Sequence, residues 1–430
     1  MRILVWDDFP ITNSGGPSGY VYNVYEYLKH NPSENIFFLS DLRKTNSHQT
    51  NEFKTDNYDK TRIQKLYSHL NNSQNRLIKY SLIIYHFIKK AITSNTSKIK
   101  YNIYKIRNFT DKQFNDKYEI GVDISVLNEY DYIHFHFTTQ LTRFLATYSN
   151  YKSKIILTTH CPCSCVDEQL YCEKKWMRLF RQFAINNECK AFYKSDFIMF
   201  PCAEAMEPYR KVKKIKKALD NRKDRIFFVP TSILDTKTSA NESDIRTKLG
   251  IPADNIVITF FGRHNHIKGY DIIKKNGIKL LNAHKDCTIV CAGTGEITAP
   301  KHERWLELGF VNNIIDYYVI SDLHIIPNRD TYFDIALLEV LRAGKHVVVS
   351  RTGGNKYFYN LPQEKTSAIH FFNVNKRKDF LSTIEKVIEQ KQNEKDSFEN
   401  GKKQNRLLFL NHFNMNTYIQ NYTNTIKSLE

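Results

Sequence analysis

Two cations lie close together in the second half of the chain, where a strand is expected to end and a helix to begin. Arg263 closes the run FFGR, and Lys268 opens the run KGYD. Arginine offers a planar set of donors and lysine a compact charge, so the pair is suited to bind a diphosphate. Without further context, two exposed surface cations would be the simpler interpretation.

Two glycine-rich turns would let the backbone approach a ligand. The run TNSGGPSG at 12–19 contains Gly16 and precedes an expected helix, and the run AGTGE contains Gly293 and Gly295 after an expected strand. Glycine permits close approach, and a helix N-terminus favours an anion. Neither turn is specific, because the first resembles many simple turns and the second is half of a dinucleotide-binding fingerprint.

A single carboxylate, Glu339, lies within an otherwise apolar helix expected at 335–342. An acidic side chain among leucines and isoleucines either faces solvent or binds a partner. A ribose diol would be a suitable partner. The loop before this helix is polar and contains Thr331, Phe333 and Asp334.

Strand-like and helix-like patterns alternate regularly along the chain. This alternation predicts parallel sheets covered by helices on both faces. In such sheets ligands bind outside the carboxyl ends of the strands. The expected strands are 3–6, 36–39, 132–137, 154–159, 197–201 and 226–230, then 256–261, 288–292, 323–327, 346–350 and 368–371. The expected helices are 20–29, 175–193, 203–219, 271–283, 335–342, 379–390 and 413–429.

Chain length and one polar stretch indicate two domains. The chain has 430 residues, more than one hydrophobic core usually serves. The segment 231–255 contains no long apolar run and is expected to separate the domains. We expect a Rossmann-like N-terminal domain at 1–230 with a basic helical insertion at about 41–118, a Rossmann-like C-terminal domain at 231–410, and a closing helix at 411–430. The two doubly wound domains should face a central cleft.

The formal net charge of +18 indicates an anionic partner. Between Lys60 and Asp111 there is no acidic residue, and lysines and arginines alternate with leucine, isoleucine, tyrosine and phenylalanine. This pattern is typical of a membrane-surface segment. A solvated, lysine-rich helical insertion is the alternative. No nucleic-acid-binding module is recognisable, so we expect no nucleic-acid partner.

The eight cysteines are expected to be thiols, because the four at 161, 163, 165 and 172 lack the paired C-x-x-C knuckles of a structural zinc site. The N-terminus lacks the features of an export signal. The longest apolar stretch, 81–88, is far shorter than the ~20 residues of a membrane-spanning helix. A cytoplasmic location is therefore expected.

The order and spacing of these features resemble the family-four group of retaining GT-B glycosyltransferases, the glycosyltransferases group 1 type. The shared pattern comprises the Gly-Gly loop, I-H-x-H at 133–136, T-x-H at 158–160, F-x-G-R-x-x-x-x-K-G, A-G-x-G, the strand ending at Pro327, L-L-E followed by A-G, and V-V-S-x-x-G-G at 348–354. The resemblance covers nearly the whole chain and leaves out mainly the basic insertion. The ordered set is far more specific than any one motif.

The resemblance implies a role for each of these positions. The C-terminal domain would bind the nucleotide sugar, with Arg263 and Lys268 on the diphosphate and Glu339 on the ribose hydroxyls. Gly16 would contact the phosphate or the transferred sugar from the opposite domain. The further donor-binding positions would be Gly293, Gly295, Thr331, Phe333 and Asp334.

The same resemblance makes the N-terminal domain the acceptor-binding domain. His160 would lie near the reacting sugar, with His136 beside it on the acceptor side. Arg263, Lys268 and His160 would be the catalytic residues. The closing helix would cross back to the N-terminal domain, as it does in similar proteins.

The chain contains no D-x-D sequence that would hold a divalent metal. We therefore expect no metal and no cofactor, with the two cations and the helix N-terminus at 333–335 stabilising the departing nucleotide instead. No carboxylate is clearly placed as a nucleophile. A front-face transfer, in which a phosphate oxygen of the donor accepts the acceptor's proton, is favoured, as is thought for similar enzymes.

Three positions depart from the family pattern. Thr331 stands where a glutamate usually holds the transferred sugar, and the neighbouring Asp330 would substitute only if the loop shifted. Asp334 replaces a glycine; it is a good helix N-cap, but it adds negative charge near the expected phosphate. The sequence Pro-Thr-Ser at 230–232 replaces the usual Pro-Asn-Gly.

The favoured function is transfer of a sugar, with a UDP-sugar as the preferred donor, to a lipid-linked or lipid-anchored glycan in bacterial surface polysaccharide or lipopolysaccharide synthesis. Such an enzyme would lie on the inner face of the plasma membrane, bound peripherally through its basic N-terminal domain. The changes at Thr331 and Asp334 motivate an alternative, a catalytically inactive GT-B protein that binds a nucleotide sugar or a partner.

Overall fold

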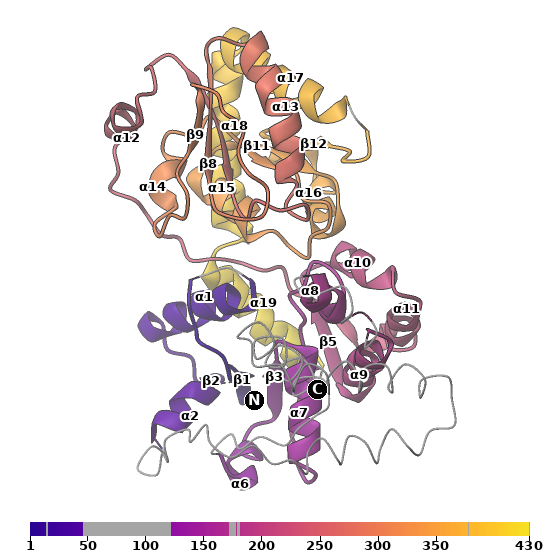
Figure 1. Cartoon of the computed structure of the whole chain (residues 1–430). Coiled ribbons are helices and arrows are strands. Elements are labelled where there is room, and N and C mark those ends of the chain that lie inside the picture. The colour runs from indigo at the N-terminus through magenta and orange to yellow at the C-terminus, as the bar shows by residue number, and fades with distance from the viewer. Residues whose placement is uncertain (14–15, 46–121, 172–177, 179–180, 377, 430) are drawn as a thin grey trace, which may run out of the picture.

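Two parallel six-stranded sheets form the framework of the molecule (Figure 1). The computed structural model describes residues 1–13, 16–45, 122–171, 178, 181–376 and 378–429. The expected fold class, two doubly wound parallel sheets covered by helices, is confirmed. From residue 46 onward, the expected basic insertion at about 41–118 lies outside the described residues.

The N-terminal unit contains the first sheet, whose strands lie in the order β2-β1-β3-β4-β5-β6. All five pairings are parallel. The strands are β1 (Ile3–Trp6), β2 (Ile36–Phe38), β3 (Tyr132–Phe135), β4 (Lys154–Leu157), β5 (Phe197–Phe200) and β6 (Ile226–Phe228). The strand order reverses between β1 and β3, and ligands of doubly wound sheets bind at such a point.

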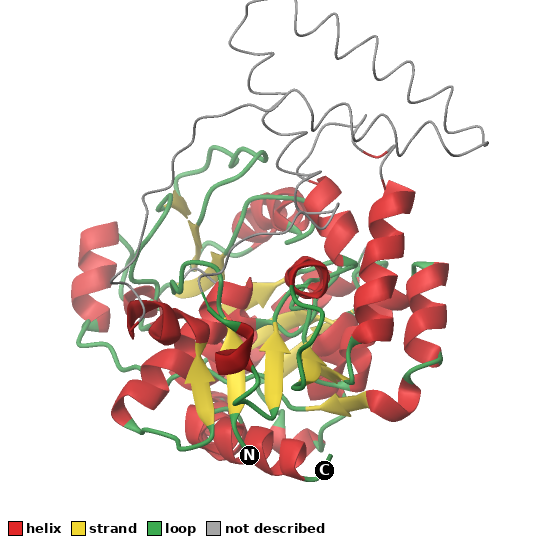
Figure 2. Ribbon diagram, turned by 90° about the horizontal axis from the view of Figure 1, so that it is seen from below, coloured by secondary structure: helices red, strands yellow, loops and turns green. Residues whose placement is uncertain are grey.

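Helices lie on both sides of the first sheet (Figure 2). They are α1 (Gly16–His30), α2 (Leu39–Thr45), α6 (Ile124–Leu127), α7 (Thr138–Thr147), α8 (Cys165–Tyr171), α9 (Arg181–Lys194), α10 (Glu207–Arg210) and α11 (Lys213–Asp220), with 3₁₀ turns η3 (Ala203–Met206) and η4 (Lys223–Arg225). The single helix expected at 203–219 is therefore wrong. Pro208 stands at the start of α10, and proline cannot continue a helix interior.

The C-terminal unit contains the second sheet, in the order β12-β11-β10-β7-β8-β9. Counted along the chain, this is the dinucleotide-binding order 3-2-1-4-5-6, with its switch point between β7 and β10. The strands are β7 (Ile256–Phe261), β8 (Cys287–Ala292), β9 (Trp305–Glu307), β10 (Leu323–Ile326), β11 (His346–Ser350) and β12 (Ile369–Phe372). Strand β9, at the edge of the sheet, is not among the expected strands.

The helices of this unit are α12 (Glu242–Leu249), α13 (Tyr270–Ala283), α14 (Ile315–Tyr318), α15 (Ile335–Ala343), α16 (Lys356–Tyr359), α17 (Asp379–Asn393) and α18 (Lys395–His412), with 3₁₀ turns η5 (Gly353–Asn355) and η6 (Gln363–Lys365). Strands β8 and β11 are buried at every position. Strands covered on both faces read as continuous apolar runs, which is why the central strands were predictable.

The chain ends in two helices rather than one. The single helix expected at 413–429 is α19 (Met415–Lys427), and α18 precedes it with a break at Phe413 and Asn414. Asn414 caps α19, because its Oδ1 accepts a hydrogen bond from the backbone N–H of Thr417 at 3.0 Å. The break lets the chain leave the C-terminal unit and return to the N-terminal one (Figure 1).

Helix α19 is anchored in the N-terminal unit by buried tyrosines. The Tyr422 hydroxyl lies 2.8 Å from Nδ1 of His134 in β3. The Tyr418 hydroxyl is hydrogen-bonded to that of Tyr20 in α1. All four side chains are buried, so separating α19 would leave polar groups unpaired in an apolar interior.

The chain passes between the two units twice, once in the linker after β6 and once between α18 and α19. These two segments are hydrogen-bonded to each other. The backbone N–H of Ile233 donates to the carbonyl oxygen of Phe413 at 3.1 Å. The N–H of Leu234 donates to Asn23 of α1 at 2.8 Å, and Arg406 of α18 forms an ion pair with Asp235 at 2.7 Å. These contacts tie the linker to both units.

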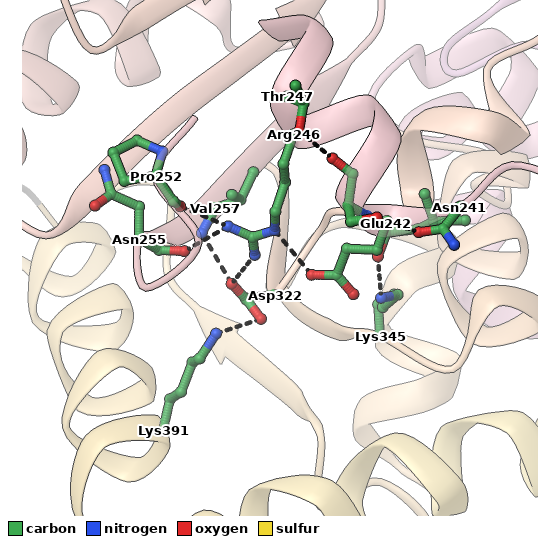
Figure 3. Close-up of polar contacts among 12 residues, drawn as sticks. Asn241, Glu242, Arg246, Thr247, Pro252, Asn255, Val257, Asp322, Lys345 and Lys391 are labelled. Carbon is green, nitrogen blue, oxygen red and sulfur yellow. Dashed lines mark hydrogen bonds and ion pairs between the residues drawn. The ribbon is translucent and has the colours of Figure 1, made fainter. Parts of the chain in front are cut away.

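A buried carboxylate organises the amino-terminal edge of the second sheet (Figure 3). Asp322 accepts a hydrogen bond from the backbone N–H of Val257 at 2.9 Å, and Arg246 lies 3.5 Å from it. Lys391 of α17 also forms an ion pair with Asp322. Arg246 in turn donates to the carbonyl oxygen of Asn255 at 2.9 Å. The cluster fastens α12 and α17 to the sheet.

Replacing Asp322 by alanine should lower the free energy of unfolding by about 3 kcal/mol, because it removes the buried carboxylate that pairs with Arg246 and Lys391. Among the described residues, Arg246 would keep only the exposed Glu242 as an ionic partner. Urea titration followed by tryptophan fluorescence measures this, since Trp305 is buried in the same unit. Asp220→Ala, which removes exposed ion pairs with Lys216 and Arg210, should leave the titration nearly unchanged. Equal effects of both variants would contradict the assigned role.

Candidate functional site

Loops at the carboxyl ends of the two sheets contact each other. A Cβ placed on Gly19 of α1 would lie 4.0 Å from Cδ1 of Ile335, the first residue of α15. The rings of His160 and Tyr332 are 5.8 Å apart, and Lys211 forms an ion pair with Asp330. The N-termini of α1 and α15 therefore lie close together, one from each unit.

The two histidines expected on the acceptor side are in direct contact. His136 follows β3 and His160 follows β4, and Nδ1 of His136 lies 2.9 Å from Nε2 of His160. Behind them, Nε2 of His134 lies 2.8 Å from the hydroxyl of Thr158. Adjacent parallel strands thus bring together residues that are 24 positions apart in the chain.

His160 has an unusual backbone conformation. Among the described residues it is the only non-glycine residue with a positive φ, at 54°. Such a conformation costs of order 1–3 kcal/mol and persists only where surrounding contacts impose it. His136 supplies one contact, and the ring of Tyr20, 4.5 Å away, supplies another. Strain of this kind clusters at functional sites, which favours His160 as a site residue.

Burial keeps the histidine cluster neutral. It lowers the pKa of His136 to about 3, and the pKa of His160 lies well below its usual value because of burial and the neighbouring His136. At neutral pH both rings are uncharged. His160 can therefore exchange hydrogen bonds with a ligand, but it does not contribute positive charge.

The stability of the protein should depend on pH through His136. The folded state holds this ring neutral, whereas the unfolded chain takes up a proton as the pH falls below about 6.5. The contribution is complete above that pH and is lost as the pH falls toward 3. Between pH 7.5 and 5.0, the wild type should lose about 2 kcal/mol more unfolding free energy than His136→Asn.

Urea titrations of both chains at the two pH values measure this difference. Burial also raises the pKa of two acids, Asp7 and Glu188, which makes their contribution to stability depend on pH in the opposite direction. Both acids are present in both chains, so this contribution cancels. His266→Asn changes an exposed histidine and is the matched control. The assignment would be wrong if His136→Asn kept the full pH dependence of the wild type.

The two expected diphosphate ligands occupy one loop of the C-terminal unit, between β7 and α13. Arg263 is exposed. Lys268 is partly exposed, and its Nζ lies 3.3 Å from Oδ1 of Asp334, which precedes α15. Gly269 has a positive φ, and a Cβ there would lie 2.1 Å from the carbonyl oxygen of Pro327. The loops after β7 and β10 are therefore in close contact at the switch point of the sheet.

Asp334 does not cap α15 with its side chain, as its position had suggested. It occupies the N-cap position, but its carboxylate makes no cap hydrogen bond. The side chain is buried and accepts from Asn328 at 2.5 Å and from Asn355 at 3.3 Å, besides its ion pair with Lys268. These stronger, charge-assisted partners draw the carboxylate away from the helix.

Glu339 lies on the second turn of α15 and is half-buried. The hydroxyl of Tyr318 donates to its Oε2 at 3.4 Å. Burial raises the pKa of Glu339, and the nearby charge of Arg342 opposes this rise. Its carboxylate can accept further hydrogen bonds, as ribose recognition would require.

The glycines at 293 and 295 have a packing role. A Cβ on Gly293 would lie 2.0 Å from the carbonyl oxygen of Gly262, and one on Gly295 would lie 2.4 Å from that of His264. Larger residues would push these turns away from the loop that carries Arg263. Gly16, the second glycine of the other turn, begins α1 with a φ of 61°.

The remaining expected donor residues are buried. The carbonyl oxygen of Thr331 accepts from the N–H of Gly354 at 3.3 Å. The ring of Phe333 packs against Phe358, with 5.2 Å between the ring centroids. A nucleotide sugar would therefore contact the backbone of Phe333 rather than its side chain. Asp330, the proposed substitute for the missing glutamate, is instead paired with Lys211 of the N-terminal unit.

A carboxylate that we did not single out from the sequence lies at the end of β1. Asp7 is buried, accepts from the N–H of Ser40 at 3.0 Å, and has no recorded partner for Oδ2 among the described residues. Burial raises its pKa to about 6. The available signal was a pair of aspartates directly after the first buried strand.

The seven described cysteines are free thiols. Burial and neighbouring groups raise the pKa values of Cys161 and Cys163, so these thiols stay protonated. Close by, the buried Glu188 accepts hydrogen bonds from the backbone N–H groups of Cys165 and Val166, and burial raises its pKa to about 7. Cys172 lies outside the described residues.

Comparisons with known proteins agree with this arrangement. Residues 255–390 match the family of glycosyl transferases group 1. A D-inositol 3-phosphate glycosyltransferase from Thermobifida fusca is 24% identical over 141 residues, which are 28% of this chain and 32% of the relative. The chain thus matches about a third of the length of such curated relatives.

Solved structures resemble the whole chain. Anabaena Alr3699/HepE in complex with UDP is 14% identical, with a TM-score of 0.59 and complete coverage of both chains. WaaG, a glycosyltransferase involved in lipopolysaccharide biosynthesis, is 11% identical, with a TM-score of 0.51 and 95% coverage of each chain. The chain therefore has the two-domain fold of GT-B glycosyltransferases, and its residues 255–390 match the glycosyl transferases group 1 family.

Proposed function

We propose that the chain is a retaining glycosyltransferase that takes its sugar from a nucleotide diphosphate donor. The observation that carries the proposal is the loop of Arg263 and Lys268, which meets the N-terminus of α15 at the switch point of the second sheet. This segment lies within the part of the chain that matches the glycosyl transferases group 1 family. Two cations and a helix N-terminus form a suitable site for a diphosphate.

The remaining donor contacts would come from both units. Glu339 would accept hydrogen bonds from the ribose hydroxyls. Gly16, at the start of α1, would approach the phosphate or the transferred sugar from the N-terminal unit. UDP is the favoured nucleotide, and the HepE structures contain UDP or UDP-glucose.

The proposed reaction exchanges one bond at the anomeric carbon of the sugar for another. The bond between this carbon and the phosphate oxygen breaks, and its electron pair stays on the nucleoside diphosphate. The acceptor oxygen bonds to the same face of the carbon, and its proton passes to the departing phosphate. Arg263 and Lys268 would stabilise the negative charge on the phosphate without a metal ion. Neutral His160 would hydrogen-bond the sugar or the acceptor.

The proposed acceptor is a lipid-linked or lipid-anchored glycan of a bacterial surface polysaccharide or lipopolysaccharide. The net charge of +18 and the acid-free segment between Lys60 and Asp111 favour binding to an anionic membrane surface. In the described part of the chain, no helix has the length and apolar character needed to span a bilayer. We propose peripheral attachment at the inner face of the plasma membrane.

A catalytically inactive GT-B protein is the second candidate. Asp334 pairs with one of the two cations, and Thr331 offers a buried hydroxyl where a carboxylate is usual. Both features weaken the case for turnover more than the case for binding.

Incubation of the full-length protein with UDP-glucose tests turnover directly. We expect slow hydrolysis without acceptor, initial release of α-glucose in the proton NMR spectrum, and the same rate in EDTA. Arg263→Ala should lower the rate about a hundredfold, because it removes a donor to the leaving phosphate. Arg210→Ala changes an exposed arginine outside the site and should retain the rate. Binding without hydrolysis, even with acceptor extracts, would favour the inactive protein.

A further inference from the structure

The carboxylate of Asp334 lies between the Lys268 ammonium and two amide groups. Its Oδ1 faces Nζ of Lys268 at 3.3 Å, and its Oδ2 accepts from Asn328 at 2.5 Å and from Asn355 at 3.3 Å. Asp334 is 4% exposed, whereas about a third of the Lys268 side chain is exposed. The ammonium is therefore held on one side and accessible on the other.

Asp334 occupies the position at which a bound anion would be stabilised most. It directly precedes the nine-residue helix α15, whose N-terminus carries a partial positive charge. A phosphate bound there would interact with this helix end and with Lys268. The carboxylate interacts with the same two groups, so the two anions oppose each other by sharing a cation and by repulsion.

We propose that Asp334 is a specificity-determining residue of the donor site, because its carboxylate competes with the donor's phosphate groups for Lys268. The inference rests on the proposed function and adds a consequence to it. Lys268 contributes only part of its charge to the bound nucleotide. The nucleoside diphosphate left after transfer is held less tightly, which favours its release.

A purely architectural role for Asp334 gives different expectations. If the side chain only holds Asn328 and Asn355, then Asp334→Asn keeps an oxygen that accepts both hydrogen bonds and changes nothing else. Asp330→Asn is the matched control. It removes the same charge from the same loop, but Asp330 is paired with Lys211 of the other unit.

Titration calorimetry with UDP on the full-length protein separates these roles. Asp334→Asn should bind UDP about tenfold more tightly than the wild type, because Lys268 gains a charge-assisted bond to phosphate. The affinity of Asp330→Asn should stay within about twofold of the wild type. Lys268→Ala should cost about tenfold in affinity in the Asp334→Asn background, since there the ammonium is fully available to the phosphate.

The outcomes distinguish the inference from the function on which it rests. Failure of every variant to bind UDP or another nucleoside diphosphate would contradict the proposed function. Binding of UDP with equal or lower affinity by Asp334→Asn would overturn the competition. If the Asp334→Asn, Lys268→Ala double variant still bound UDP more tightly than the wild type, the role of Lys268 would be overturned. Repulsion between Asp334 and the phosphate would then explain the higher affinity. Thermal melting checks folding, and Asp334→Ser replaces the first variant if that variant fails to fold.

Discussion

The parallel direction of all strands in both sheets is the constraint on which the site depends. Parallel strands place every strand-to-helix loop at one edge of the sheet. The linker contact between Ile233 and Phe413, with the anchoring of α19 through Tyr418 and Tyr422, turns the two edges toward each other. Loops from strand ends that are far apart in the chain then lie close together.

Few of the described side chains at these two edges carry an unpaired charge. His136 and His160 of the N-terminal unit are neutral because they are buried. Lys268 is paired with Asp334, and Arg263 is exposed to solvent. The proposed donor site would therefore favour a dianionic group only moderately.

Much of the fold could be predicted from the sequence because buried parallel strands are short apolar runs. Helix α18 was missed because the first twelve residues of its sequence, KDSFENGKKQNRLLFLNH, contain a single large apolar residue, Phe398. The short edge strand β9 has one buried residue in three, which is too little for a strand pattern.

The identities of the candidate site residues could be predicted from the sequence, but their contacts could not. The histidine pair was expected on one side, yet only the register of β3 and β4 reveals the bond between its rings. Two of the partners of Asp334, Lys268 and Asn355, come from other loops, so no local pattern could show that Lys268 is already paired. The glycines at 293 and 295 looked like ligand-binding glycines, whereas their tightest contacts are with the neighbouring loop.

Hydrogen–deuterium exchange with and without UDP-glucose would locate a bound donor on the chain. We expect slower exchange in the loops at 262–269, 293–296 and 328–336. That protection should be lost in Glu339→Ala and kept in Glu364→Ala, which alters an exposed glutamate of the same unit. Protection confined to the N-terminal unit, or absent everywhere, would contradict a donor site at the carboxyl edge of the second sheet.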